Sequence, residues 1–421
     1  MSSPPIRLPS GVRDFLPRAA AVRRELAARV AGVFEAWGYA RVVTPVFEHA
    51  EVLERGLGAG ARAAAIRFVE PGTGEVVALR PDITPQIARL VATRMADAPG
   101  PIRLCYEGAS YRLGRRDGEP GQREIVQAGI ELCDGPPPDG DAEVLAVAAA
   151  ALARVLAAPE RSIASGAGEA GARVELHEWR LDLGHVAPAA FVLAETPAGG
   201  ARDALAAALA RKDRAGVRAA THGLAIAPLA EALAHLWGPA AVTLDRADAL
   251  PWPAHVRAAL AELRAVIAAF GVLAEPPVPP LAVDLGDVRG FEYYTGVRFA
   301  AYAAGAGDAV ARGGRYDELL GRYGRARRAT GFAIDLEAVA LACGSEPERA
   351  IGVATDDPEL ARAFRAAGVR AVVQRAAPAD WPRWLAAAGL DAAIVAGRLE
   401  PAGIAAPADD IAALIALLNG E

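Results

Sequence analysis

The chain has 421 residues, of which 53% are hydrophobic and 23% charged, a composition typical of a globular protein with two or three domains. Its formal net charge of −6 argues against a large nucleic-acid-binding surface and leaves room only for a local basic patch. The N-terminal residues lack the apolar core of a signal peptide, and no run of about 20 uncharged apolar residues predicts a membrane span. We therefore expect a cytoplasmic protein without a membrane partner.

The cysteines and histidines do not form the patterns of a metal site or a disulfide framework. Cys105, Cys133 and Cys343 are widely separated and form no CxxC pair, which favours reduced thiols. The six histidines show no metal-ligand spacing. The sequence therefore predicts no metal and no cofactor.

The first 138 residues alternate helical and strand patterns. The first helical pattern stops at Gly38, and Pro45 indicates an edge or a bulge in the strand that follows. A turn precedes the second helix, and Asp82 or Thr84 can cap that helix. A loop rich in glycine and arginine, 114–121, separates the last two strands. The predicted helices are 18–37 and 86–95, and the predicted strands are 41–47, 75–80, 102–111 and 122–133.

Proline clusters at 136–138 and 276–280 bound an alanine-rich middle region with helical patterns. Its predicted helices are 143–156, 201–209, 215–223, 228–236 and 254–270, with one strand at 181–185. The residues after this region predict strands at 281–285, 295–302 and 308–311, a Gly-Gly-Arg-Tyr turn at 313–316, and a strand that continues into a helix over 331–341.

A small alternating unit ends the chain, which favours a compact α/β module. Its predicted strands are 350–355, 371–374 and 392–396, and its predicted helices are 358–367, 379–388 and 409–418. Strand-rich segments on both sides of a helical region predict an α+β fold, in which an antiparallel sheet flanked by helices is interrupted by an insertion. We expect a first part of the core at 1–138, a mainly helical insertion at 139–279, a second part of the core at 280–345 and the α/β module at 346–421.

Five segments, in the right order, resemble the motifs of class II aminoacyl-tRNA synthetases and of histidyl-tRNA synthetases in particular. They are AWGYARVVTPVFE (36–48), which resembles the dimerisation motif 1; LRPDITPQIARLV (79–91), which resembles an LRPE-x-T segment; YEGASYRLGRRDGEPGQREIVQAGIEL (106–132), which resembles motif 2; RGFEYYTG (289–296), which resembles the histidine-specific RGLDYY segment; and GGRYD with GFAIDLE, which fall where motif 3 belongs. The resemblance covers 8–135 and 281–341 and implies a class II synthetase-like fold.

The chain as a whole most resembles the regulatory subunits of ATP phosphoribosyltransferase, a family of histidyl-tRNA synthetase paralogues. The resemblance implies a subunit without chemistry of its own, which a short-form catalytic subunit requires for the first step of histidine biosynthesis. It also implies feedback inhibition by histidine as effector and a homodimer within a hetero-oligomer. The alternative function is that of a histidyl-tRNA synthetase or a related amino-acid-activating enzyme.

Carried over by motif position, the resemblance implies a histidine-binding pocket and no catalytic residue. Free histidine offers an ammonium, a carboxylate and an imidazole, and an unpaired polar group in a closed site costs about 1–3 kcal/mol. The implied contacts are Asp82, Thr84 and Gln127 for the ammonium; Glu131 and Tyr293 for the imidazole; Arg112 and Arg289 for the carboxylate; and Tyr294 and Tyr316 for the wall. Gln127 and Glu131 are four positions apart, which places both on one face of a strand.

Each of these residues also has a structural alternative. Asp82 could serve only as a helix cap, and the paired tyrosines could be ordinary sheet aromatics. Arg112 and Arg289 could pair with surface acids. Four further arginines form the strongest basic cluster, which is either a phosphate or partner contact or a solvated loop: Arg322, Arg325, Arg327 and Arg328.

Two features that a synthetase uses to hold ATP are missing. Where class II enzymes carry Gly-Leu-Glu-Arg, this chain has Asp335-Leu336-Glu337-Ala338, so a cation is lost and an acid is gained. Arg112 is followed by Leu113 and Gly114 instead of by an acid that holds adenine. Arg289, which stands where synthetases place a catalytic arginine, is retained. The short C-terminal module has few basic residues, so we do not expect tRNA as a partner.

Overall fold

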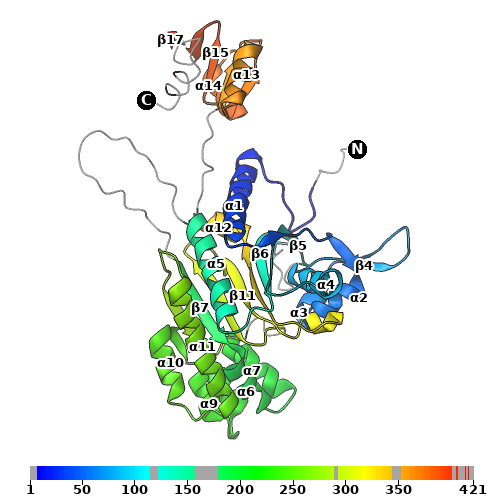
Figure 1. The fold of residues 1–421 in the computed structure, drawn as a ribbon, viewed down its shortest axis with the longest axis vertical. Helices are drawn as coiled ribbons and strands as arrows, with labels where there is room; N and C mark the ends of the chain where they lie inside the picture. The colour runs from blue at the N-terminus through cyan, green and yellow to red at the C-terminus, as the bar shows by residue number, and fades with distance from the viewer. Residues whose placement is uncertain are drawn as a thin grey trace, which may run out of the picture. The chain divides into compact units, whose positions relative to one another are not determined.

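The computed structural model describes residues 7–113, 122–156, 179–288, 293–343 and 352–400, together with 404–405, 413 and 416. The chain separates into two compact units, Met1–Ser345 and Glu346–Glu421, and each is described here by itself (Figure 1).

The larger unit is built on a nine-stranded sheet. Neighbouring strands are antiparallel, except that β1 runs parallel to β5 and β7 runs parallel to β9. The predicted α+β class with a largely antiparallel sheet is therefore confirmed. In spatial order the strands are β1 (Ala40–Arg41), β5 (Ile102–Tyr111), β6 (Glu124–Cys133), β12 (Ala329–Asp335), β11 (Ala311–Arg315), β10 (Val297–Ala303), β7 (Trp179–His185), β9 (Leu281–Asp284) and β8 (Trp237–Pro239).

Three helices cover one face of this sheet and pack against one another: α1 (Pro17–Ala36), α5 (Asp139–Leu156) and α12 (Leu336–Cys343) (Figure 1). The buried side chains of α1, such as Val30 and Phe34, recur at helical spacing and join one apolar cluster with Ile130 and Phe332 of the sheet. As predicted, the chain reverses at Gly38, where φ is 81°.

The opposite face carries a smaller layer built around α4 (Thr84–Arg94) and a short 3₁₀ helix, η1 (Leu320–Tyr323). Ile87 and Val91 of α4 pack with Leu104 of β5 in a second apolar cluster. A three-stranded sheet adjoins α4 with the strand order β2 (Phe47–His49), β4 (Val76–Leu79), β3 (Arg67–Val69), and it is accompanied by α2 (Ala50–Gly56) and α3 (Ala59–Ala64).

The helices of the middle region lie together at one end of the large sheet, in green in Figure 1. They are α6 (Val186–Ala194), α7 (Gly200–Ala210), α8 (Arg214–Thr221), α9 (Ala227–Leu233), α10 (Ala240–Asp248) and α11 (Ala254–Leu273). We call these helices the insertion helices. The range 139–279 also contains α5 and β7, which belong to the layers of the large sheet. The four-part division of the chain stays a prediction.

The smaller unit has a five-stranded sheet with helices on both faces. Neighbouring residues of β13 point to opposite sides, so that Val353 packs with Phe364 and Ala354 packs with Leu385. In spatial order the strands are β14 (Arg370–Val373), β13 (Gly352–Thr355), β15 (Ala392–Val395), β16 (Arg398–Glu400) and β17 (Ile404–Ala405), and the helices are α13 (Pro358–Ala366) and α14 (Trp381–Ala388). The helix predicted at 409–418 lies outside the described residues, apart from 413 and 416.

The predicted turn at 313–316 is wrong, because residues up to Arg315 belong to β11 and pair with β10 and β12. The glycines serve close packing instead of chain reversal: a Cβ at Gly313 would lie 2.5 Å from the carbonyl oxygen of Gly331. Arg315 forms a buried ion pair with Asp141 of α5 at 2.9 Å. The strand predicted at 308–311 therefore begins later, at Ala311.

The strand predicted at 41–47 is also interrupted, since β1 ends at Arg41 and β2 begins at Phe47. Pro45 lies in the gap, where it has no N–H to give to a neighbouring strand.

Candidate functional site

A cavity of about 760 Å³ opens on the sheet where β6, β10, β11 and β12 meet the N-terminal end of α4. Its wall includes seven of the nine predicted site residues: Asp82, Thr84, Arg112, Gln127, Tyr293, Tyr294 and Tyr316. Glu131 lies behind the wall, and Arg289 lies outside the described residues. The fold therefore gathers side chains that are far apart in the sequence into one cavity.

The N-terminal end of α4 presents Asp82 and Thr84 to the cavity. Oδ1 of Asp82 accepts a hydrogen bond from the backbone N–H of Thr84, the first residue of the helix, at 3.2 Å. Arg112 donates from Nε to the carbonyl oxygen of Pro81 at 2.8 Å. Burial raises the pKa of Asp82, and the charge of Arg112 acts against this effect. Asp82 thus supports the helix and also reaches the cavity.

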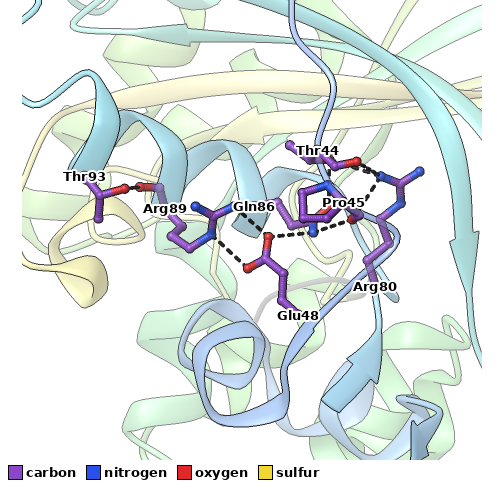
Figure 2. A network of polar contacts seen from close by, with 7 residues as sticks. All are labelled: Thr44, Pro45, Glu48, Arg80, Gln86, Arg89 and Thr93. Carbon is purple, nitrogen blue, oxygen red and sulfur yellow. Dashed lines mark hydrogen bonds and ion pairs between the residues drawn. The ribbon is translucent and has the colours of Figure 1, made fainter. Parts of the chain in front are cut away.

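A buried network behind α4 fixes this helix, as Figure 2 shows. Nη1 of Arg80 donates to the carbonyl oxygen of Thr44 at 2.9 Å, and Nε donates to that of Ala109 at 2.7 Å. Gln86 of α4 donates from Nε2 to the carbonyl oxygen of Pro45 at 2.9 Å. From the sequence, no role was assigned to Arg80. Its position directly before the turn at 81–85 could have indicated a contact that fixes this turn.

The same network continues along α4 to Glu48 (Figure 2). Arg89 contacts both carboxylate oxygens of Glu48, at 2.8 and 2.6 Å, and Gln86 donates to one of them at 2.8 Å. The strand segment that resembles motif 1 is thus joined to the helix that carries Thr84.

Gln127 of β6 reaches the cavity with a side-chain amide nitrogen that lacks a partner. Its side chain is 6% exposed, and its Nε2 makes no hydrogen bond with any residue that the structure describes. Ala128 and Ile130 face the opposite apolar layer, as the strand period of two requires. A buried amide without a partner is unfavourable, so a polar ligand is the group best suited to complete this site.

Glu131 is buried against the cavity wall, and its predicted contact with an imidazole stays a prediction. Its carboxyl group is 1% exposed, accepts a hydrogen bond from Oγ1 of Thr84 at 2.6 Å, and accepts another from the hydroxyl group of Tyr316. Burial raises the pKa of Glu131 to about 8. A Cβ at Gly331, opposite Glu131 on β12, would overlap the carboxylate, so glycine is required there. Glu131 thus holds two wall residues in place from behind.

Three tyrosines form an aromatic wall. The ring centroids of Tyr293 and Tyr294 are 4.7 Å apart, and those of Tyr293 and Tyr316 are 5.8 Å apart in an edge-on arrangement. Burial raises the pKa of all three hydroxyl groups, that of Tyr294 to about 12. These hydroxyl groups therefore stay neutral at physiological pH. The three side chains form an aromatic surface with hydroxyl groups that can donate or accept hydrogen bonds.

Several acidic side chains belong to the cavity wall. Asp182, Asp284, Asp287 and Asp335 line the cavity, and sequence reasoning assigned a ligand role to none of them. Oδ1 of Asp335 accepts the backbone N–H groups of Glu337 at 2.9 Å and Ala338 at 3.0 Å, so this acid caps α12. Three of these acids are paired with cations: Asp182 with Arg180, Asp284 with Lys212 and Asp287 with Arg298. Asp335 stands where the resemblance places a glycine, so a triphosphate there would meet an acid, which opposes nucleotide activation.

The position of the missing motif 3 arginine is a small apolar spot on the wall, because Ala338 lines the cavity there. The neighbouring residue Glu337 is buried, and its carboxylate accepts hydrogen bonds from Arg13 and Gln122. Arginines do reach the cavity from other strands, but Arg298 is paired with Asp287 at 3.0 Å and Arg312 with Asp308 at 2.5 Å.

Two members of the predicted basic cluster contact the protein itself. Arg327 pairs with Asp134 at 2.9 Å and donates to the carbonyl oxygens of Ala96 and Ala98, while Arg325 pairs with Asp97 at 2.9 Å. These contacts favour a structural role for both arginines. Within the described ranges, no three or more His, Cys, Asp or Glu residues are grouped so as to hold a metal ion, and no helix has the length and apolarity needed to cross a membrane.

Comparison with known proteins gives consistent matches. The family model for histidyl-tRNA synthetase matches residues 11–339. The ATP phosphoribosyltransferase regulatory subunit of Anaeromyxobacter dehalogenans (strain 2CP-1) is 45% identical over 340 residues, which are 79% of this chain and 90% of the relative. That of Syntrophotalea carbinolica is 40% identical over 341 residues, or 79% of this chain and 74% of the relative.

Among solved structures, an ATP phosphoribosyltransferase regulatory subunit/histidyl-tRNA synthetase from Bacillus halodurans C is similar, with a TM-score of 0.77 and 27% identity. The match covers 94% of this chain and 99% of that one.

Proposed function

Because the chain belongs to the histidyl-tRNA synthetase-like family of ATP phosphoribosyltransferase regulatory subunits, we propose that it regulates a separate, short-form catalytic subunit and performs no chemistry itself. In this role it is required for the first step of histidine biosynthesis, the condensation of ATP with phosphoribosyl pyrophosphate. The amino-acid-activating alternative is not favoured.

The acidic side chain of Asp335 on the cavity wall supports a non-catalytic role. Amino-acid activation needs positive charge on the triphosphate, where negative charge develops in the transition state. The wall has Ala338 where the resemblance places an arginine, and it adds the Asp335 carboxyl group nearby. We therefore propose that the chain cannot hold ATP in a reactive pose.

The amide nitrogen of Gln127, which has no partner among the described residues, is the observation that carries our proposal of histidine as effector. An amino acid offers two groups that this amide can bind: the ammonium, through the amide oxygen, or the carboxylate, through Nε2. Asp82 lies on the same wall as an anionic partner for the ammonium, and the aromatic wall of Tyr293, Tyr294 and Tyr316 suits an imidazole ring. These features together match a zwitterion with a flat polar ring.

Feedback inhibition would follow if histidine binds one state of the complex more tightly than the other. A coupling free energy of about 1–3 kcal/mol is typical of such regulation.

Reconstitution tests the regulatory role. The purified chain is mixed with the short-form catalytic subunit from the same genome, and formation of the phosphoribosyl-ATP product is followed. We expect the activity of the mixture to exceed that of the catalytic subunit alone and to fall when histidine is added. An unchanged rate in the mixture would remove the regulatory proposal, and histidine-dependent ATP–pyrophosphate exchange by the chain alone would establish the alternative.

Calorimetry tests the effector site. We expect Tyr293→Phe to weaken histidine binding about tenfold, because a neutral hydroxyl partner of the ligand is lost. Tyr302→Phe is a matched control. Tyr302 also lines the cavity, but it lies on β10 outside the aromatic wall, so the loss of its hydroxyl group should leave histidine binding unchanged. Equal affinity of wild type and Tyr293→Phe would show that this hydroxyl group does not bind the ligand.

A further inference from the structure

Lys212, the only lysine of the chain, lies in the turn between α7 and α8 of the insertion. Its backbone has φ of 55°, a left-handed conformation that residues other than glycine rarely adopt. Its Nζ lies 2.5 Å from Oδ1 of Asp284, and the two side chains are 29% and 18% exposed. A strained backbone that presents the one compact ammonium group to an acid indicates a specific contact.

The partner of Lys212 stands at the end of β9 and lines the cavity. Oδ1 of Asp284 also accepts the backbone N–H of Gly286 at 3.0 Å. The space around Gly286 is tight, because an added Cβ would lie 2.7 Å from the carbonyl oxygen of Leu233 and 3.4 Å from Nζ of Lys212. One carboxylate thus joins the insertion to the start of the following loop.

A second contact joins the same two parts. The backbone N–H of Leu285 donates to the carbonyl oxygen of Leu236 at 3.0 Å, and β8 pairs with β9. Residues 284–286 are therefore held from the insertion side by both a side chain and backbone groups.

The loop that follows leads into the proposed ligand site. Asp287 pairs with Arg298 of β10 at 3.0 Å, and both line the cavity together with Val288. The chain re-enters the described residues at Tyr293 and Tyr294, on the aromatic wall. The position of Asp284 therefore sets where this cavity-lining loop begins.

We propose that the Lys212–Asp284 contact is a clamp through which the insertion helices position Asp284, Asp287 and Val288 on the cavity wall, and thereby set the affinity of the cavity for its effector. The identity of the effector rests on the proposed function, whereas the clamp itself rests on contacts between described residues. Lys212 is a positioning residue in this scheme, because it acts through Asp284 and does not line the cavity.

The first test compares two ion pairs of the insertion. Lys212→Met removes the charge and keeps most of the stem, whereas Arg218→Met breaks the exposed pair with Glu231 at 3.3 Å, which does not involve β9. By calorimetry, we expect Lys212→Met to weaken histidine binding about tenfold and Arg218→Met to leave it unchanged. Both variants should keep nearly wild-type melting temperatures, since partly exposed ion pairs add little stability.

A double-mutant cycle separates the clamp from a general disturbance. If Lys212 acts through Asp284, Lys212→Met combined with Asp284→Asn should bind histidine no more weakly than Asp284→Asn alone. Additive losses, or wild-type affinity in Lys212→Met, would overturn the clamp.

The single lysine also permits a direct observation. Reductive ¹³C-methylation keeps the charge and labels only Nζ of Lys212 and the α-amino group. We expect the Lys212 signal to shift when histidine is added to protein that binds it by calorimetry, and a stationary signal would overturn the clamp while leaving the effector proposal intact. If wild type binds no histidine, the effector proposal fails instead. The clamp is then judged by whether Lys212→Met, unlike Arg218→Met, changes activation of the catalytic subunit.

Discussion

Glu131 is a single buried carboxyl group that holds two residues of the cavity wall in place. Thr84 and Tyr316 both donate to it, and both also line the cavity. Because burial favours the neutral carboxylic acid, the pKa rises to about 8 in the folded protein, above the ordinary value of 4.5. The folded protein therefore binds this proton more tightly than the unfolded chain does.

The raised pKa predicts a pH dependence of stability. The stabilising effect of the proton on Glu131 is complete below the unfolded pKa of 4.5 and is lost as pH rises through about 8. We expect the free energy of unfolding to fall more steeply between pH 6 and pH 9 in wild type than in Glu131→Gln, which cannot ionise. Urea unfolding at a series of pH values measures both slopes, and parallel curves would contradict the prediction.

The site residues differ in how far the sequence determines them. The strand period places Gln127 and Glu131 on the same side of β6, and Ile130 between them faces the apolar core as expected. The position of Glu131 behind the wall depends on Gly331, which stands opposite in β12. That register joins distant parts of the chain, so the spacing along one strand could not reveal it.

At the scale of elements, Arg80 and Gln86 connect the N-terminal end of α4 with the segment before β2. The guanidinium group of Arg80 bonds to backbone carbonyl oxygens of the segment before β2 and of β5, while Gln86 holds the helix to the same segment (Figure 2).

Arg80→Met should therefore lower the free energy of unfolding by about 2–3 kcal/mol, because buried acceptors lose a charged donor. It should also weaken histidine binding, since Asp82 and Thr84 lie directly after Arg80. Arg264→Met is a suitable control: its pairs with Asp245 and Asp248 are exposed, and their loss should cost less than about 1 kcal/mol. Denaturant unfolding compares the three proteins, and equal losses in the two variants would refute a special role for Arg80.

Long periodic elements were the predictable part of the fold. The apolar spacing of α1 and α11 gave helices close to those observed, since many residues contribute to each pattern. Helices α6 and α10 were not predicted, although the shorter helices α8 and α9 were. The sequence of α6 is apolar along almost its whole length, so no helical period stands out in it. The glycines at 313 and 314 suggested a turn, but they lie within a strand, where the neighbouring strands leave no room for a Cβ atom.

At the scale of the whole molecule, an apolar surface beside the motif 1-like segment needs an explanation. Val43 is 81% exposed, and Val46 and Phe47 are a little less than half exposed. Phe47 meets Phe68 of β3 with ring centroids 5.6 Å apart, so the surface continues onto the three-stranded sheet. Contiguous exposed apolar side chains of this kind mark association surfaces. They support the proposed homodimer through this region.

This surface gives a prediction for the assembled protein. We expect wild type to be a dimer at micromolar concentration by light scattering, and Val43→Asp to shift it toward monomer, because a charge buried in an apolar interface is strongly unfavourable. Val272→Asp is the matched control, since Val272 is 85% exposed at the end of α11, outside the motif 1-like segment. A monomeric wild type, or a dimer equally disturbed by both substitutions, would contradict dimerisation through this surface. A dimer disturbed only by Val43→Asp would place the contact on the segment that Arg80 and Gln86 join to α4, and would connect subunit association with the effector site.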